Sequence, residues 1–227
     1  MTGRTVSDRR LREATSEFFL EWAAAARDLS QPDEAILMEY VRLTGEASRV
    51  LPDDAGARME HGVALSHLGG SFSSARNEPR AAECFRQFLD IAREAAAMDP
   101  GSLSLALELH IAEGRYSSVA KAAGDLEEEG RLLEAAAAGL ERIQAKDGGL
   151  DSHVNFVKAG TLRALARSLA SRDRHAEACE RMSQALEAQW QRALSRPSEW
   201  PEHESLENAL TMTDERLDKY KGGQALI

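Results

Sequence analysis

The chain has 227 residues and a formal net charge of −10, and 43% of its residues are hydrophobic but only 5% are aromatic. Its 16 glycines and 6 prolines exclude collagen-like and low-complexity sequence and argue against a turn-rich β fold. A chain rich in alanine and poor in aromatic residues favours helix almost throughout, so we expect an all-α protein. Its acidity disfavours contact with phosphate backbones, so we expect no nucleic-acid partner.

Apolar residues recur at helical spacing along the chain, and turn-forming residues interrupt them at fairly regular intervals. The pattern predicts about ten helices, at residues 7–29, 33–51, 54–72, 77–98, 103–113, 117–129, 131–145, 153–171, 175–195 and 203–221. Pairing of neighbours predicts antiparallel hairpins at about 7–51, 54–98, 102–129 (with a turn at 114–116) and 153–195, plus an extra helix at 131–145. The predicted helical domain covers residues 1–195, and a linker with an acidic capping helix is predicted at 196–227.

Two of the predicted hairpins carry the same pattern of large and small residues. The first has Leu65, Leu68, Gly69, Phe72, Ala81, Phe85 and Phe88, and the second has Leu162, Leu165, Ala166, Leu169, Ala178, Met182 and Ala185, at identical spacings. The small residue lets two helices approach closely while the large ones fill the space beside it. At these residues the sequence resembles the tetratricopeptide repeat, a helix-turn-helix unit with this order of large and small residues. The resemblance implies long, degenerate repeats stacked as a right-handed superhelix; an irregular α-bundle is the alternative.

The resemblance also implies a non-enzymatic scaffold or adaptor that binds a protein or peptide in the groove lined by its first helices. Arg163 and Arg167 are four residues apart on one helix face, and such a pair suits an acidic side chain or a C-terminal carboxylate. The residues that we expect to contact the partner are Arg163, Arg167, Trp22, His67, Ser73, Glu108, Tyr116 and Lys158. A homodimer formed through the apolar Phe18, Phe19 and Trp22 is a further alternative. The acidic helix near the C-terminus either caps the stack or lies across the basic stretch at residues 158–181.

No catalytic or metal-binding motif stands out among the six histidines and two cysteines. Glu60 with His67, and His110 with Glu113, have the best spacing for a metal, but polar helix faces often produce such pairs. We therefore expect no catalytic residue, no metal and no cofactor. The alternative is an all-α enzyme, or a protein that binds a small ligand or metal in a pocket between helices, with His67, His110 and Glu113 as the residues to test.

The sequence also bears on the compartment of the protein. No apolar run reaches the roughly 18 residues of a membrane span, and residues 1–12 lead into acidic residues without the apolar segment of a signal peptide. We expect a cytoplasmic protein without membrane contact, in which Cys84 and Cys179 are reduced thiols.

Overall fold

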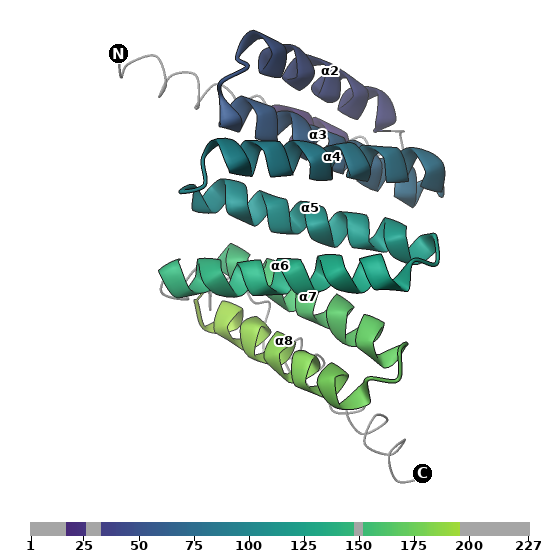
Figure 1. Cartoon of the computed structure of the whole chain (residues 1–227). Coiled ribbons are helices and arrows are strands. Elements are labelled where there is room, and N and C mark those ends of the chain that lie inside the picture. The colour runs from purple at the N-terminus through teal and green to yellow at the C-terminus, as the bar shows by residue number, and fades with distance from the viewer. Residues whose placement is uncertain (1–16, 26–32, 148–151, 196–227) are drawn as a thin grey trace. The chain divides into compact units, whose positions relative to one another are not determined.

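The computed structural model describes residues 17–25, 33–147 and 152–195, which contain helices and no strand (Figure 1). Residues 17–25 are helical, and after them come α2 (Glu34–Val50), α3 (Ala55–Ser74), α4 (Glu78–Met98), α5 (Leu103–Ala122), α6 (Leu126–Asp147), α7 (Ser152–Ala170) and α8 (His175–Ser195). The predicted all-α class is therefore confirmed. The predicted linker and capping helix at 196–227 lie outside the described residues. Within those residues, no helix is long and apolar enough to cross a membrane.

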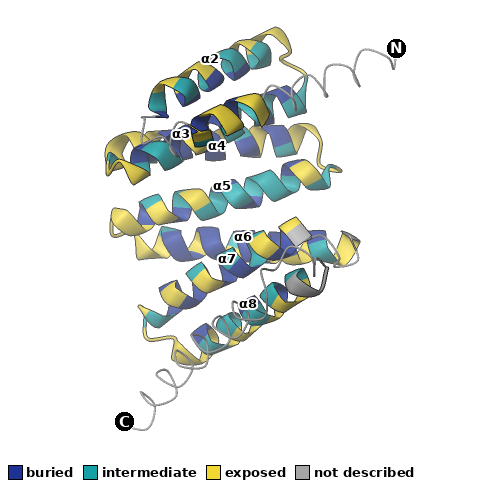
Figure 2. Ribbon diagram, turned by 180° about the vertical axis from the view of Figure 1, so that it is seen from behind, coloured by how far each residue is buried: buried dark blue, intermediate teal, exposed yellow. Residues whose placement is uncertain are grey.

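The chain forms two compact units, which divide in the last turn of α5, between Val119 and Ala120. Unit 1 contains residues 17–25, α2, α3, α4 and most of α5, and unit 2 contains α6, α7 and α8. Buried and exposed residues alternate along the helices at helical spacing (Figure 2). Each helix therefore turns one face into a core and leaves another in solvent.

In unit 1, α3 packs against both α2 and α4. Gly69 on α3 allows the close approach to α4, because a Cβ at this position would lie 2.8 Å from Cε1 of Phe85 and 3.1 Å from Cβ of Cys84. On the α2 side, the rings of Phe19 and Tyr40 stack with their centroids 5.4 Å apart. Tyr40 is fully buried, so this stack ties residues 17–25 to the core of the unit.

In unit 2, α7 packs against both α6 and α8. The core cluster consists of leucines and alanines from all three helices: Leu133, Ala137, Leu162, Leu165, Leu169, Ala178 and Ala185. A polar contact crosses between α6 and α7, where the buried Glu129 accepts a hydrogen bond from Ser168 Oγ at 2.9 Å. The other oxygen of Glu129 lies 3.5 Å from Lys121 Nζ. A Cβ at Gly130 would lie 2.6 Å from the guanidinium of Arg172, so α6 carries a glycine where this side chain crosses it.

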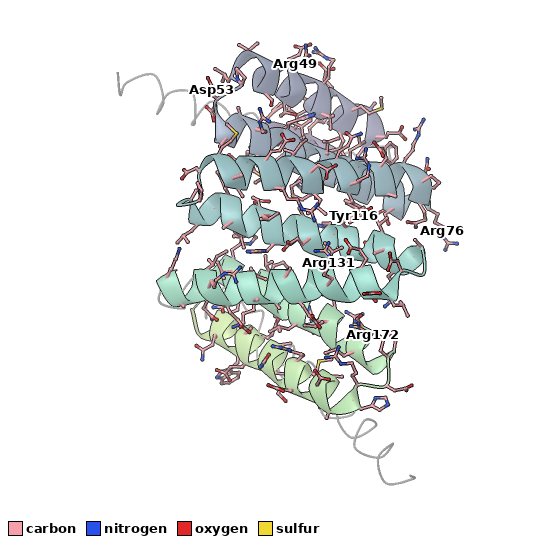
Figure 3. All side chains as sticks on the ribbon, viewed as in Figure 1. Arg49, Asp53, Arg76, Tyr116, Arg131 and Arg172 are labelled. Carbon is pink, nitrogen blue, oxygen red and sulfur yellow. The ribbon has the colours of Figure 1, made fainter. Side chains whose placement is uncertain are left out.

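The same turn joins consecutive helices at three places in the chain. In each turn one residue is left-handed, with φ of 58° at Arg76, 79° at Gly124 and 60° at Asp173. The next N–H donates to a carbonyl five residues back: Asn77 to Phe72, Asp125 to Ala120 and Arg174 to Leu169, at 2.8, 2.9 and 3.0 Å. This pattern is the Schellman motif, which satisfies carbonyls that a helix end leaves without partners. Figure 3 shows Arg76 at the turn between α3 and α4.

These turns give three segments of the chain a common register. Gly124 follows Arg76 by 48 residues, and Asp173 follows Gly124 by 49. Seven residues before each left-handed residue lies a small, buried residue: Gly69, Ser117 and Ala166. The correspondence expected between the hairpins at 54–98 and 153–195 therefore extends to the segment 103–147.

The turn predicted at 114–116 is wrong, because α5 continues through this segment. The helix predicted at 117–129 is wrong for the same reason, since its residues are divided between α5 and α6. The helix predicted at 131–145 exists as part of α6, which starts five residues earlier. A glycine within a helix costs only about 1 kcal/mol relative to alanine. Gly114 therefore remains helical between good helix formers.

The break in this region lies at Gly124 instead. Its positive φ is one that a glycine adopts without strain. Asp125 then caps α6, since its Oδ1 accepts a hydrogen bond from the N–H of Glu128 at 3.0 Å. The spacing of Asp125 and Glu128 resembles that of a capping box, which was the signal in the sequence for a helix start here.

Replacement of Gly69 by alanine should lower the free energy of unfolding by about 1 to 3 kcal/mol, because the new methyl group would overlap the ring of Phe85. Gly70 is the matched control, since no atom lies within 4 Å of the position of its Cβ. Gly70→Ala should leave stability unchanged or raise it by up to about 1 kcal/mol. Urea unfolding measures both variants, and equal stabilities would contradict the close approach of α3 and α4 at Gly69.

The three turns should respond to glycine in the same way. Arg76→Gly and Asp173→Gly should each raise the free energy of unfolding by about 0.5 to 1 kcal/mol. Each replaces a residue with a Cβ by glycine, which adopts a left-handed backbone conformation without steric cost. Gly124→Asp should lower it by a similar amount. Thermal unfolding checks this, and a loss of stability in either of the first two variants would speak against the shared turn.

Candidate functional site

One face of α7 is open to solvent along the helix. Successive residues of a helix are turned by about 100°, so Phe156, Gly160, Arg163 and Arg167 fall within a sector of about 60°. Phe156 is 48% exposed, both arginines are exposed, and no atom lies within 4 Å of the position that a Cβ of Gly160 would take. We call these four residues the α7 stripe.

Among the described helices, α7 alone contains neither aspartate nor glutamate. Other arginines of the chain pair with acids of their own helix; Arg42 Nη2, for example, lies 2.6 Å from Oε1 of Glu39. Such pairs form because side chains three or four residues apart lie on one helix face. Arg163 and Arg167 lack an acidic neighbour of this kind, and within the described residues neither forms an ion pair. Their charges are therefore not neutralised by this part of the chain.

The two arginines of the stripe present most of their donors to solvent. Nε of Arg167 donates to the carbonyl of Arg163 at 3.3 Å, which orients this guanidinium and leaves its terminal nitrogens available. The two residues are about 6 Å apart along the axis, and Phe156 precedes Arg163 by about 10 Å. A guanidinium can hold a carboxylate through two parallel hydrogen bonds. The stripe therefore has room for two carboxylates at one end and an apolar group at the other.

The apolar end of the stripe lies against α8. The guanidinium of Arg192 is placed over the ring of Phe156, 4.6 Å from its centroid. Arg192 belongs to the last turn of α8. The C-terminal end of α8 is therefore beside the first turns of α7.

The shared turn register provides an internal comparison for the two arginines. Arg163 lies ten residues before its left-handed residue, and the equivalent positions hold Ser66 on α3 and Gly114 on α5. Arg167 lies six residues before it, and the equivalents are Gly70 and Ser118. Equivalent helices thus form with small uncharged residues at both places. Both arginines are exposed, so the packing of α7 does not require them.

Lys158, the third basic residue expected at the site, lies elsewhere on α7. It is two residues beyond Phe156, which turns it by about 200° from the stripe. Its Nζ donates to Oε1 of Gln144 at 2.6 Å, and Nε2 of Gln144 donates to Oδ1 of the buried Asn155 at 2.9 Å. The structure therefore brings Arg163 and Arg167 together and directs Lys158 toward α6.

The other expected contact residues belong to unit 1: Trp22, His67, Ser73, Glu108 and Tyr116. Trp22 is 50% exposed and its ring centroid lies 5.8 Å from that of the exposed Phe18. His67 is exposed on α3, and the carbonyl oxygen of Ser73 accepts a hydrogen bond from the N–H of Arg76. These residues belong to unit 1, whereas the α7 stripe belongs to unit 2.

Within unit 1 the structure joins three residues that the sequence did not connect. The hydroxyl of the buried Tyr40 donates to the carboxylate of Glu60 on α3. Glu108 on α5 is half-buried, and burial raises the pKa of its carboxyl to about 7, with a further contribution from the negative charge of Glu60. The contacts join three different helices, so no local spacing in the sequence indicates them. A carboxyl that titrates near neutral pH is able to take up or release a proton under ordinary conditions.

The residues considered for a metal do not gather into one cluster. Nδ1 of His110 lies 2.8 Å from Oε2 of Glu113, and both side chains are nearly buried on α5. Within the part of the chain that the structure describes, no group of three or more His, Cys, Asp or Glu could hold a metal ion. Cys84 and Cys179 are free cysteines, and burial raises the pKa of the Cys84 thiol.

No family model and no curated protein matches the chain. A solved structure described as the "DHF58 filament" is similar to it, with a TM-score of 0.45 and 19% sequence identity. The similarity covers 83% of this chain and 97% of that chain. A likeness of this extent identifies neither a family nor a ligand for this protein.

Glu108→Gln should change how stability depends on pH. The folded-state pKa of Glu108 is about 7, above the ordinary value of 4.5, so the folded chain binds more protons between these two values. Glu108 therefore lowers the stability of the wild-type protein as pH rises through this window. The variant should match the wild type near pH 4 and exceed it at pH 8, by on the order of 1 to 3 kcal/mol.

Urea unfolding at pH 4, 6 and 8 measures this difference. Glu78→Gln, at an exposed position in the first turn of α4, is the control with the same chemical change. A difference between wild type and Glu108→Gln that does not vary with pH would contradict the raised pKa of Glu108.

Proposed function

We propose that this protein is a non-enzymatic binding protein of the helical-repeat kind, whose α7 stripe holds an acidic segment of another protein. The observation that carries the proposal is the pair Arg163 and Arg167. They are exposed on the one described helix without acidic residues, at positions where the equivalent helices carry serine or glycine. Two such charges one turn apart on a helix face without acidic residues are matched to a ligand that supplies the carboxylates.

The chemistry of the stripe defines the class of partner. Two guanidinium groups one turn apart match two carboxylates on an extended or helical peptide, or one acidic side chain with a C-terminal carboxylate. Gly160 leaves open space between the arginines and Phe156, so the peptide backbone can approach α7 there. The net charge of −10 on the chain repels other acidic groups. Binding should therefore depend on the local contacts of the stripe and weaken as salt rises.

We infer that the protein is a long-helix, tetratricopeptide-like array rather than an irregular bundle. The inference is supported by the three Schellman turns at nearly equal spacing and by the small residue seven positions before each left-handed residue. Two packing patterns can coincide by chance, but a third with the same turn is harder to explain without a repeat. We retain the expectation of a cytoplasmic protein, and the exposed Phe18 and Trp22 keep a homodimer open.

A second candidate function is an all-α enzyme or a protein that binds a small ligand between its helices. The cluster of Tyr40, Glu60 and Glu108 favours it, because a carboxyl with a pKa of about 7 beside a second carboxylate is suited to proton transfer. We rank it lower, because burial alone is enough to raise the pKa of Glu108, and no substrate is needed to explain it.

Arg163→Gln with Arg167→Gln should weaken the binding of an acidic peptide by about tenfold or more, which corresponds to about 1.4 kcal/mol. The change removes both charges while keeping a polar side chain of similar helix propensity. A fluorescein-labelled octaglutamate peptide with a free C-terminal carboxylate is the probe, and fluorescence anisotropy at low salt gives its Kd.

The matched control is Arg115→Gln with Arg142→Gln, which removes two exposed arginines from α5 and α6. The control should bind the peptide about as well as the wild type, because neither arginine belongs to the α7 stripe. Both double variants lose two positive charges, so a difference between them reports on the position of the charges and not on net charge. Equal losses in the two double variants would contradict a specific site on α7.

A further inference from the structure

The chain itself contains an acidic segment that suits the α7 stripe. Residues 199–207 contain Glu199, Glu202, Glu204 and Glu207 and no lysine or arginine. We propose that this segment, which lies outside the described residues, binds the α7 stripe of its own chain and competes there with the partner. The inference rests on the proposed function, because both assign a carboxylate ligand to Arg163 and Arg167.

The contact between Arg192 and Phe156 indicates where the segment begins. It places the C-terminal end of α8 beside the apolar end of the stripe, and α8 ends at Ser195. A chain spans at most about 3.3 to 3.6 Å per residue, so residues 199–207 can extend about 14 to 40 Å from Ser195. The stripe runs about 16 Å from Phe156 to Arg167. The four glutamates can therefore reach both arginines.

A second acidic run, at residues 125–129, is mostly engaged within the fold, since Asp125 caps α6. Glu128 lies 2.6 Å from a guanidinium nitrogen of Arg131, and Glu129 accepts from Ser168. The segment 199–207 is thus the acidic run with a short connection to the stripe. Trp200 within it also supplies an apolar side chain of the kind that Phe156 accommodates.

A tethered ligand competes effectively even when its contacts are weak. A short connection gives an effective concentration of the order of millimolar. A segment with an intrinsic affinity of about 100 μM would then occupy the stripe roughly ten times out of eleven. The apparent affinity of a partner for the whole chain would then be about tenfold weaker than its affinity for the open stripe.

The test uses the full chain and the same labelled octaglutamate peptide. The tail variant carries Glu199→Gln, Glu202→Gln, Glu204→Gln and Glu207→Gln. A control variant removes the same number of negative charges at exposed positions elsewhere, with Glu21→Gln, Asp53→Asn, Glu78→Gln and Glu127→Gln. The tail variant should bind the peptide about tenfold more tightly than the wild type and the control. Adding Arg163→Gln and Arg167→Gln to the tail variant should remove this gain.

The outcomes separate the two proposals. Equal Kd values for the tail and control variants would overturn the intramolecular contact. If binding still depended on Arg163 and Arg167 in that case, the proposed function would stand alone. If the peptide bound to neither the wild type nor the tail variant, both proposals would fail.

Discussion

The close approach of paired helices at a small residue is the constraint on which the fold depends. At Gly69 the ring of Phe85 fills the space that a Cβ would need, and in unit 2 α8 presents Ala178 and Ala185 to the leucines of α7. Alanine buries little apolar area per residue, so a pair of this kind needs many contacts along its length. The helices from α3 to α8 have 19 to 22 residues each, which supplies that length.

An interface of alanine and leucine does not by itself fix how far one helix slides along another. Polar contacts between helices provide this information in both units. Tyr40 bonds to Glu60 between α2 and α3, and Glu129 bonds to Ser168 between α6 and α7. Since Tyr40, Glu129 and Ser168 are buried, a shift by one turn would leave donors and acceptors without partners, at a cost of about 1 to 3 kcal/mol each. Packing therefore brings the helices together, and these bonds set the register.

The sequence predicted the last two described helices to within one residue. The helix expected at 175–195 has those bounds in the structure, and that expected at 153–171 starts and ends within one residue of α7. Gly114 shows where local reasoning failed, because a glycine followed by an aromatic residue looks like a turn although Gly124 and the Asp125 cap form the real one. The cluster of Tyr40, Glu60 and Glu108 was beyond local reasoning, since its residues are far apart in sequence and meet only when three helices pack. That Arg163 and Arg167 share one helix face was predictable, because i, i+4 spacing is itself a local property.

The significance of these arginines follows from what surrounds them rather than from their number. Several arginines on α2, α4 and α6 pair with acids of their own helix, as Arg86 does with Glu83 and Asp90, and exposed pairs of that kind contribute little to stability. Omitting acids from α7 therefore costs the fold almost nothing, yet it leaves two exposed guanidinium groups without an acidic neighbour on their helix in an otherwise acidic chain. Both arginines are exposed on α7, so they do not disturb the packing of this helix. The electrostatic character of α7 thus depends on the acidic residues that it lacks as much as on the arginines that it carries.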